Sequence, residues 1–574
     1  MSLRFGLMCA GTTLSQWEAE CVRELLRLPG VEPVLLIIED RDPGDRKSLC
    51  ERPLTVNQLF WRLYYRISVG RRPRASEPVD LSGELGRLPV LRCRVPRDGR
   101  SSESFAEADI EKIRSFTLDF ILRFGFGTIR GEILELPRLG VWSFHYGDEE
   151  KCRGVPPGFW EIYHGDAVTG AALQRLTDRP DGGIVLHKGY FQTIDHSWVR
   201  NRDNILFGTV DWPARICREV LHNGPGIAEA LPSRSKARVY RAPNNLQMLA
   251  FLLRVGRNYL RAVRRLFLRD YWNIGLINKP VSEVVEGGID ASEISWLKDT
   301  RKGRYRADPF GLRLGGASTI LYEDYDYPAQ KGTISALTLG SGGAWEDHGR
   351  VLELPVHASY PCLFEHEGEI YCVPETYQAR AALLFKAVEF PRRWEKVATL
   401  IEGFAAVDPT VFRHDGRWWL LCTNNDNHDC AKLYAWHAEH LTGPWRPHPL
   451  NPLKCDVRNS RPAGPPFLHE GKLYRPAQDC SRAYGGAVSI NLVRELSPAA
   501  FEEVTVARLA PDEAGPLPDG LHTLSPLGDR TLVDGKVLVF DPAKGLAEIA
   551  CRLAKARPGW TAGWPRRHTR RQGS

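Results

Sequence analysis

The sequence is short of the features that mark secreted and metal-caged proteins. Its 13 cysteines are scattered along 574 residues, and no two of them form a CxxC pair. An odd number of dispersed cysteines argues against a disulfide framework and against a zinc cage. We therefore expect free thiols in a reducing compartment and no bound metal.

Long apolar runs are missing as well. The longest ones, such as 35–38 and 246–253, are interrupted well before the ~20 residues that a membrane-spanning helix needs. The apolar stretch within 1–12 is short and indicates a strand rather than a signal peptide. With 43% hydrophobic and 26% charged residues, the composition excludes disordered and collagen-like chains. We expect a large soluble protein in the cytoplasm.

The positive charge is confined to two segments. Residues 229–269 hold ten Lys and Arg and one acid, and residues 557–574 hold five Arg and no acid, whereas the whole chain carries a net charge of only +7. The remaining residues are therefore mildly acidic. A nucleic-acid-binding domain shows a basic face within its own fold, so we expect no nucleic-acid partner.

Residues 1–228 alternate strand-like and helix-like segments, which predicts a doubly wound α/β domain with a parallel sheet covered on both faces. In such sheets the active site lies beyond the carboxyl ends of the strands. His145 closes one predicted strand, at 140–145, and is followed by a glycine-containing loop.

Residues 229–269 form a basic connector in which 245–269 is an amphipathic helix. Apolar residues recur at helical spacing on one side, and five arginines cover much of the rest. Two interpretations stay open: a connector packed on its neighbours with solvated arginines, and a helix lying on the inner face of an anionic membrane. The apolar residues are Leu249, Leu252, Leu253, Leu260, Val263 and Phe267.

Residues 270–553 repeat with a period of roughly 50 residues, which is typical of propeller blades. Segments 360–371, 408–419 and 466–474 each contain apolar residues and then a glycine followed three positions later by an aromatic residue. Each glycine fits a hairpin turn between two strands. We predict a five-bladed β-propeller, with a β-sandwich as the alternative, and a basic disordered tail at 554–574.

The stretch 143–183 is the richest in chemistry-bearing residues. It contains Ser-x-His at 143–145, Arg-Gly at 153–154, Gly-Asp and Thr-Gly within 165–170, and Asp-Gly-Gly at 181–183. Residues 4–200 thereby resemble the folate-dependent formyltransferase superfamily, which includes methionyl-tRNA formyltransferase and the sugar-nucleotide N-formyltransferases. The chain departs from that pattern where the family has Asn, at Ser143, and where it has Ser-Leu-Leu-Pro, at 146–149.

The resemblance implies transfer of a formyl group from 10-formyltetrahydrofolate to an amine, through a tetrahedral carbon with a developing oxyanion. His145 can donate a hydrogen bond or a proton to that oxygen, with Ser143 assisting. Asp181 can orient the imidazole or accept the proton that the amine releases. The structural alternative for His145 is a satisfied histidine at a strand end.

Further residues of this domain are candidates for binding. The resemblance implies that Phe124-Gly125-Phe126-Gly127 lines the folate pocket, although the same run fits a tight strand exit. Arg153 either holds the loop by pairing with Asp148 or Glu161, or leaves one of these carboxylates to receive the substrate ammonium.

In a propeller, the residues that open the blades converge on the central channel. The candidates here combine carboxylates with an arginine, which suits sugar hydroxyls, while Ser359 stands where a further blade-opening Asp would be. Asp308, Asp408 and Glu375 could also supply an acid and a base for glycoside hydrolysis. The alternative is turn chemistry alone. The candidate residues are Asp308, Glu323, Glu375, Asp408, Arg461 and Asp479, together with aromatics such as Tyr360, Trp418 and Tyr484.

This region resembles the N-terminal domain of glucosamine inositolphosphorylceramide transferases through 307–310, 359–361, 407–409, 461–464 and 475–480. Together the two regions predict an enzyme that formylates an amino sugar, linked to a nucleotide or lipid, while the propeller holds the glycan. Two alternatives remain: a propeller-based glycosidase or glycosyl-transfer enzyme, and a carbohydrate-binding protein with a degenerate formyltransferase site.

Overall fold

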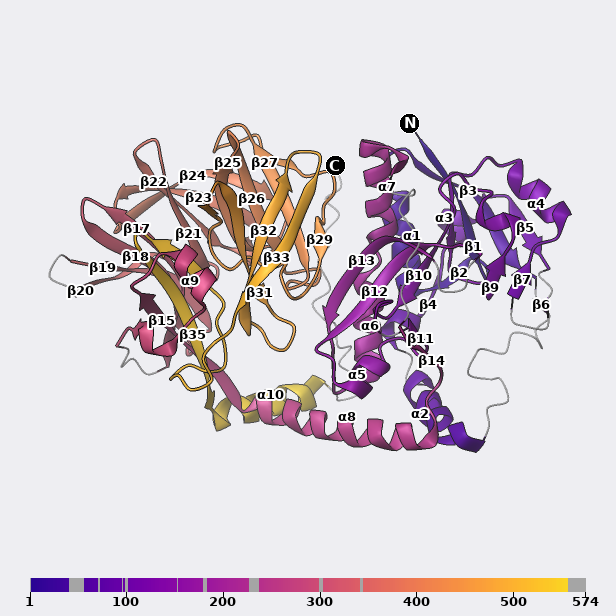
Figure 1. Cartoon of the computed structure of the whole chain (residues 1–574), viewed down its shortest axis with the longest axis horizontal. Coiled ribbons are helices and arrows are strands. Elements are labelled where there is room, and N and C mark those ends of the chain that lie inside the picture. Colours follow the sequence, from indigo (N-terminus) through magenta and orange to yellow (C-terminus); the bar gives the residue numbers. More distant parts are fainter. Residues whose placement is uncertain are drawn as a thin grey trace.

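The computed structural model places an α/β domain beside a β-propeller, with helix α8 running beneath both (Figure 1). The described residues are 2–40, 56–70, 73–94, 97–98, 102–151, 153–178, 183–226, 237–298, 303–340 and 344–555. Two sequence predictions, the role of Asp181 and the tail from residue 556 onward, lie outside these ranges.

The α/β domain is built on a seven-stranded sheet in the order β13-β12-β10-β8-β1-β3-β5. Five strands are parallel, but β12 runs antiparallel to both β10 and β13, so the expected all-parallel sheet is corrected to a mixed one. Antiparallel neighbours need only a short connection, and eight residues join β12 to β13. The strands are β1 (Leu3–Cys9), β3 (Val31–Glu39), β5 (Val90–Cys93), β8 (Phe120–Arg123), β10 (Val141–Tyr146), β12 (Val168–Arg175) and β13 (Ile184–Gln192).

Helices cover both faces of this sheet. Alternate residues of β1, such as Phe5 and Leu7, pack with α1 and α7 on one face, whereas Met8 packs with α4 on the other. The helices of this domain are α1 (Gln16–Leu26), α2 (Leu59–Gly70), α3 (Ser82–Leu85), α4 (Glu107–Arg114), α5 (Trp160–His164), α6 (Trp198–Gly208) and α7 (Trp212–Asn223). The short strands are β2 (Thr13–Ser15), β4 (Pro78–Asp80), β6 (Arg97–Asp98), β7 (Ser102–Ser104), β9 (Thr128–Arg130), β11 (Arg153–Gly154) and β14 (Val239–Tyr240).

The C-terminal region is a five-bladed β-propeller, which confirms the prediction from the repeat. Four blades are consecutive, and the fifth joins β15 and β16 to β34 and β35, so that the first and last strands close the ring. The first and last strands of the four consecutive blades are β17 (Arg304–Leu314) and β20 (Trp345–Leu352), β21 (Ser359–His366) and β24 (Arg393–Glu402), β25 (Ala406–His414) and β28 (Arg446–Pro447), and β30 (Phe467–His469) and β33 (Phe501–Leu509).

The two middle strands of those blades are β18 (Ala317–Asp326) and β19 (Lys331–Leu339), β22 (Glu369–Glu375) and β23 (Ala381–Glu389), β26 (Arg417–Asn424) and β27 (Lys432–Ala438), and β31 (Lys472–Asp479) and β32 (Ala487–Leu496). The closing blade contains β15 (Leu268–Ile277), β16 (Ile294–Trp296), β34 (Leu524–Leu527) and β35 (Arg530–Phe540), and β29 (Lys454–Cys455) pairs with β27. Helix α9 (Val281–Gly287) lies between β15 and β16 in the sequence, and helix α10 (Pro542–Lys555) follows β35.

The repeated glycines occupy hairpin turns, as predicted. Gly368, Gly416 and Gly471 have φ of 77°, 76° and 72°, and the residue before each also has a positive φ. Two consecutive residues with positive φ define the type I′ turn, whose twist matches that of the flanking strands.

The two domains share a buried interface. The Lys432 ammonium lies 2.8 and 2.9 Å from the two carboxylate oxygens of Asp211, and the lysine is fully buried. The Val457 N–H donates to the carbonyl of Tyr190 at 3.0 Å. Trp212 and Cys455 belong to one hydrophobic cluster that crosses the boundary.

Helix α8 (Asn245–Leu266) packs through a different face from the one its leucines predict. Met248, Phe251 and Asn258 are buried, and the Phe251 ring stacks on Phe159 with ring centroids 4.2 Å apart. The leucines expected on the packed side are instead exposed, because the aromatic residues of α2 and α5 cover the Met248–Phe251 face. Within the described ranges, no helix is long and apolar enough to span a bilayer, and every cysteine is a free thiol.

Candidate functional site

The first strands of three blades share the same backbone conformation. Asp308, Tyr360 and Asp408 each precede a proline, have φ of 51°, 43° and 50°, and stand at a break in strand register. A bulge of this kind re-aims the side chain of the bulged residue. The third equivalent residue is thus Tyr360 rather than Ser359, which corrects the alignment made from the sequence.

Asp408 lies at the centre of a buried hydrogen-bond network. Its carboxylate accepts from Arg461 Nε at 2.6 Å and from Gln478 Nε2 at 2.8 Å, while its N–H donates to Glu375 at 2.9 Å. All of these side chains are buried. Because residues from three blades meet here, the network fixes Arg461 relative to the carboxylates of the neighbouring blades.

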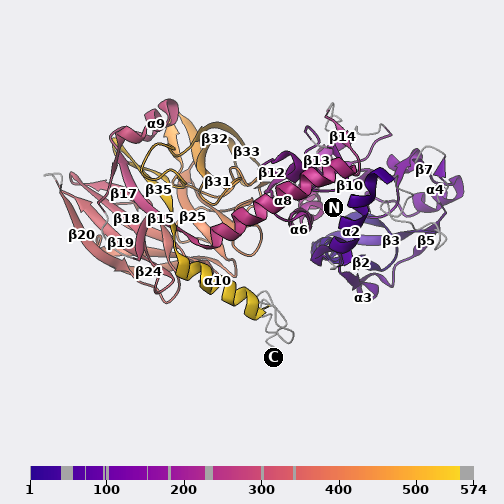
Figure 2. The same cartoon turned by 90° about the horizontal axis from the view of Figure 1, so that it is seen from below.

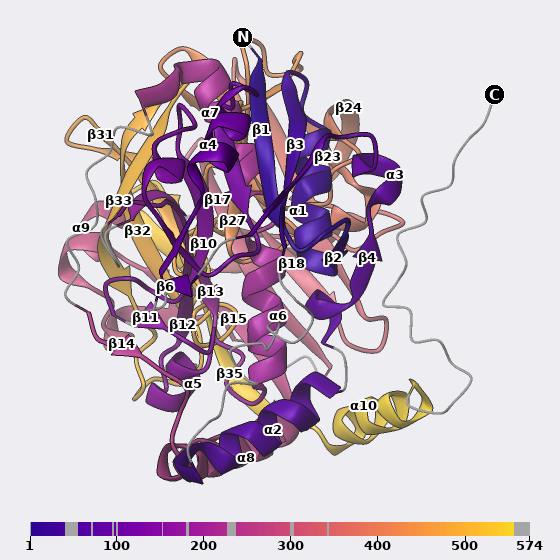
Figure 3. The same ribbon diagram turned by 90° about the vertical axis from the view of Figure 1, so that its right-hand side faces the viewer.

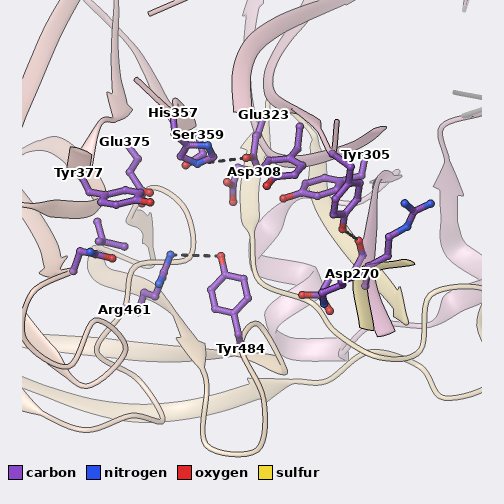
Figure 4. Close-up of a pocket in the computed structure, with 16 residues that line it drawn as sticks. Asp270, Tyr305, Asp308, Glu323, His357, Ser359, Glu375, Tyr377, Arg461 and Tyr484 are labelled. Atoms are coloured by element: carbon purple, nitrogen blue, oxygen red, sulfur yellow. Dashed lines mark hydrogen bonds and ion pairs between the residues drawn. The ribbon is translucent and has the colours of Figure 1, made fainter. Parts of the chain in front are cut away.

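A polar cavity of about 380 Å³ opens beside this network (Figure 4). Of the six predicted polar residues of the propeller, Asp308, Glu323, Glu375 and Arg461 line it. Asp408 is not a lining residue, but its carboxylate accepts a hydrogen bond from Arg461, which is one. Asp479 is not among the lining residues; its carboxylate accepts instead from Arg508 Nε at 2.7 Å and from the Ser481 N–H at 3.0 Å.

Sequence reasoning missed most of the aromatic wall of this cavity. The rings of Tyr305 and Tyr325 stack with centroids 4.9 Å apart, and the Tyr327 ring meets Tyr325 edge-on. The alternation of acidic residues and tyrosines in 323–327 was the available signal, because alternate residues of a strand share a face. Tyr484, a candidate named from the sequence, also lines the cavity, and the other lining residues are Arg269, Asp270, His357, Ser359, Tyr377, Val407, Asn425 and Lys544.

Burial raises the pKa of three carboxyl groups of the cavity, those of Asp308, Glu323 and Glu375. Burial raises the pKa of Asp308 to about 6, although the neighbouring His522 opposes the shift. Burial, with the charges of Asp308 and Glu375, raises the pKa of Glu323 well above its ordinary value. Such groups can donate hydrogen bonds or protons to a bound saccharide near neutral pH.

Asp308, His522 and Asp534 form the one group in the described ranges with metal-ligand spacing. His522 Nδ1 lies 2.6 Å from an Asp534 oxygen. The Asp534 carboxylate also accepts the backbone N–H groups of His522, Thr523 and Asp308. Since hydrogen bonds within the protein already use these ligand atoms, the group serves to join the closing blade to the next one.

In the α/β domain, Ser143 and His145 alternate on β10 and so point to the same side of the sheet. The Ser143 hydroxyl oxygen accepts from Arg123 Nη2 at 2.8 Å and from Nε at 3.3 Å. Arg123 also donates to the carbonyls of Phe126 and Gly127. Sequence reasoning missed Arg123, although it stands directly before the predicted folate segment 124–127.

The predicted folate segment is held against β1. The N–H groups of Phe124 and Gly125 both donate to the Met8 carbonyl, at 2.9 and 3.2 Å. The Phe126 ring lies 5.6 Å from that of Phe105. The Arg123 guanidinium joins this segment to Ser143, so the predicted folate segment and the predicted catalytic strand form one structural unit.

The charged residues that follow β10 have different partners, so their roles differ. Asp148 pairs with Lys188, at 2.9 Å. The Arg153 guanidinium donates to the Ala237 carbonyl at 2.6 Å and so ties the loop to the segment before α8. Glu161 is buried, and burial with the charges of Asp166 and Asp148 raises its pKa to about 7.

Comparisons with known proteins match both regions. Residues 289–514 match the family described as glucosamine inositolphosphorylceramide transferase 1, N-terminal. The relative of that name from Oryza sativa subsp. japonica is 34% identical over 206 residues, which is 35% of this chain and 28% of the relative. The one from Arabidopsis thaliana is 32% identical over 208 residues, which is 35% of this chain and 27% of the relative. The chain therefore spans about a quarter of the length of these relatives.

Shorter matches are found to methionyl-tRNA formyltransferases. The methionyl-tRNA formyltransferase of Phenylobacterium zucineum is 37% identical over 110 residues, covering 19% of this chain and 33% of that enzyme. Among solved structures, Zg3597, a family 117 glycoside hydrolase from Zobellia galactanivorans, is 16% identical with a TM-score of 0.32, covering 49% of this chain and 94% of that one. The family match and the plant relatives confirm the sequence resemblance of the propeller over residues 289–514, whereas the formyltransferase resemblance rests on shorter, partial matches.

Proposed function

We propose that the chain is a transferase that moves a formyl group from 10-formyltetrahydrofolate to the amine of an amino sugar linked to a nucleotide or lipid. The observation that carries this proposal is the place of Ser143 and His145 on one face of β10, with His145 near the carboxyl end of the strand and Ser143 bonded to the guanidinium of Arg123. Strand β10 runs parallel to β8, and in sheets of parallel strands ligands bind beyond the carboxyl ends.

The charge of Arg123 supports the proposal chemically. Formyl transfer develops negative charge on the formyl oxygen, and the bound folate supplies the electrophilic carbon. Arg123 brings a fixed positive charge to Ser143, where the family has a neutral amide. The Ser143 hydroxyl accepts from Arg123 and can donate its own proton onward, so the pair can replace that amide as the oxyanion donor.

His145 and the acidic loop complete the proposed chemistry. His145 would donate to the formyl oxygen, and Asp181 would take the proton released by the amine. Glu161 is the better candidate for the substrate ammonium, because Asp148 already pairs with Lys188. The ammonium would draw the buried Glu161 carboxyl into its ionised form.

The propeller would hold the glycan. Its cavity combines stacked tyrosines with carboxyl groups and the buried cation of Arg461. Such a lining suits the apolar faces and hydroxyls of sugar rings. We propose a cytoplasmic location for the chain.

The test is to incubate the full chain with 10-formyltetrahydrofolate and a panel of amino sugars, free, nucleotide-linked and lipid-linked, and to identify products by mass. We expect an N-formyl sugar. Asp308→Asn should raise the acceptor KM with little effect on transfer at saturation, because Asp308 lines only the propeller cavity. Failure of every acceptor, together with no binding of the folate, would refute the proposal.

A second candidate, glycosyl chemistry in the propeller, is favoured by Glu323 and Asp308. Both carboxyl groups line one cavity, and burial raises the pKa of each, as an acid catalyst requires. In that case Glu323→Gln would abolish release or transfer of a sugar, and His145→Ala would leave it unchanged.

A further inference from the structure

Three helices from distant parts of the chain lie along one face of the molecule. Figures 1 and 3 show α2, α8 and α10 together at the bottom of the structure, and Figure 2 shows the same face from below. The ring of Tyr64 in α2 meets Phe251 in α8 with centroids 5.8 Å apart. A Cβ on Gly545 of α10 would collide with the Phe267 ring that follows α8. We call α2, α8 and α10 the helical face.

The helical face exposes an unusual amount of apolar surface. On α8, Leu246, Leu253 and Leu260 are 79, 68 and 70% exposed and recur every seven residues. This spacing places them in one stripe along the outer side of the helix. Further exposed apolar residues lie on the neighbouring helices and their flanks: Val56, Leu59, Phe60, Leu63 and Ile67 at α2, and Phe540, Leu546 and Leu553 at α10.

Positive charge borders this apolar stripe. The three helices contain ten Lys and Arg and a single acid, Glu548. On α8, Arg257, Arg264 and Arg265 are exposed beside the leucines. An exposed apolar stripe flanked by cations is the pattern of a helix lying in the headgroup region of an anionic membrane.

The propeller cavity opens next to this face. Arg269 and Asp270, just after α8, and Lys544, in the first turn of α10, line the cavity. The Lys544 ammonium also donates to the Leu268 carbonyl at 2.5 Å, which fixes α10 at this edge. A headgroup projecting from a bilayer beneath the helical face would therefore meet the cavity.

From this placement, we propose that the helical face binds an anionic lipid bilayer and that the propeller cavity receives the sugar headgroup of a lipid in that bilayer. The second half of this proposal rests on the proposed function, because it selects a lipid-linked acceptor over a nucleotide-linked one. The first half requires neither formyl transfer nor saccharide binding.

Membrane binding is tested by sedimenting the full chain with phosphatidylcholine vesicles, with and without phosphatidylserine. We expect binding only to the anionic vesicles, weakening as salt rises. Replacing Arg257, Arg264 and Arg265 by Gln should weaken it by about 100-fold, at about fivefold for each arginine. Leu249→Glu with Leu253→Glu should abolish it, since each buried leucine contributes about tenfold or more.

The matched controls change equally exposed residues of the propeller. Leu468→Glu, Val506→Glu and Arg494→Gln should leave vesicle binding unchanged. Equal binding to neutral vesicles, or full binding by the helical-face variants, would overturn the proposal. So would a wild-type dimer that the Leu249→Glu, Leu253→Glu variant converts to a monomer, because a second copy would then cover this face.

A second readout reports on the helical face directly. Cys551 of α10 is the one exposed cysteine within the described residues, so it can carry an environment-sensitive fluorophore. We expect its emission to shift to the blue with anionic vesicles, whereas the same label on a Cys551→Ser, Val506→Cys variant should not shift. If the Cys551 label stays in water while the chain binds vesicles, another surface makes the contact.

The choice of acceptor is tested separately, with one amino-sugar headgroup presented free or on a lipid in anionic vesicles. We expect formyl transfer to the vesicle-bound acceptor to be the faster and to fall in the Leu249→Glu, Leu253→Glu variant, while transfer to the free acceptor is unchanged. Vesicle binding without any transfer would refute the proposed function alone. Transfer that ignores the vesicle would refute the headgroup assignment alone.

Discussion

The guanidinium of Arg123 lies 2.8 Å from the hydroxyl oxygen of Ser143, on neighbouring parallel strands. This contact changes what the serine can do chemically. Alone, a serine is a shorter donor than the asparagine that the formyltransferases have at this position. With Arg123 bonded to it, the same position carries a cation on the strand face that also bears His145, and a positive charge is what a developing oxyanion requires.

Arg123→Gln should therefore damage catalysis more than Ser143→Ala. Loss of an oxyanion donor lowers the rate by about 10²–10³, and we expect this loss in kcat for Arg123→Gln. Ser143→Ala leaves the guanidinium in place and should lose less. Steady-state kinetics on both variants checks the order; an Arg123→Gln enzyme with wild-type kcat would show that the arginine only supports the loop.

The buried Glu161 should make stability depend on pH. Its pKa rises from 4.5 to about 7 through burial. Between these values the folded carboxyl keeps a proton that the unfolded one has lost, so stability falls as pH rises, by about 3 kcal/mol in all. We expect Glu161→Gln to flatten this part of the profile of Tm against pH. Glu150→Gln, at an exposed position of the loop, is the control and should reproduce the wild-type slope.

The pair of Lys432 and Asp211 should hold the two domains together. Lys432→Met leaves the Asp211 carboxylate buried without its cation, which costs about 3–5 kcal/mol. A lower Tm in thermal unfolding checks this, and Asp211→Leu combined with Lys432→Met should recover much of the loss. The exposed pair of Arg313 and Asp529 is the control, because Arg313→Met there should cost less than about 1 kcal/mol. Equal effects at the two sites would contradict the role given to the interface.

The protonation of Glu323 can be read from saccharide binding. Because its pKa is raised well above the usual range, we expect a neutral carboxyl that donates a hydrogen bond at pH 7. Glu323→Gln keeps a donor and should retain affinity within a few-fold, whereas Glu323→Leu should lose about tenfold, as for one hydrogen bond of about 1.4 kcal/mol. Isothermal titration with the glycan acceptor decides, with the exposed Glu353→Gln as control. An equal loss in the Gln and Leu variants would show an ionised Glu323.

Local patterns of the sequence predicted the elements but not all of their contacts. The glycine repeat predicts hairpins because a type I′ turn requires positive φ, and Gly416 and its counterparts confirm it. The five blades follow from that period. The place of His145 follows because a strand that enters a glycine-containing loop brings its last residues to the edge of the sheet.

What the sequence could not show depends on partners far along the chain. Helical periodicity finds the leucines of α8, but only the aromatic residues of α2 and α5 determine that Phe251 is the buried side. The contact of Arg123 with Ser143 depends on the order of strands in the sheet, and that of Lys432 with Asp211 on how two domains dock. Asp181 lies outside the described residues, and its role stays a prediction.

The most direct test follows an isotope-labelled formyl group from 10-formyltetrahydrofolate to an amino-sugar acceptor. We predict that the full chain transfers the label to the sugar nitrogen, and that His145→Ala lowers the rate by about 10²–10⁴ while His222→Ala, an exposed control, does not. If His145→Ala transferred the label at the wild-type rate, or if the wild-type chain left the label on the folate, the account would be contradicted.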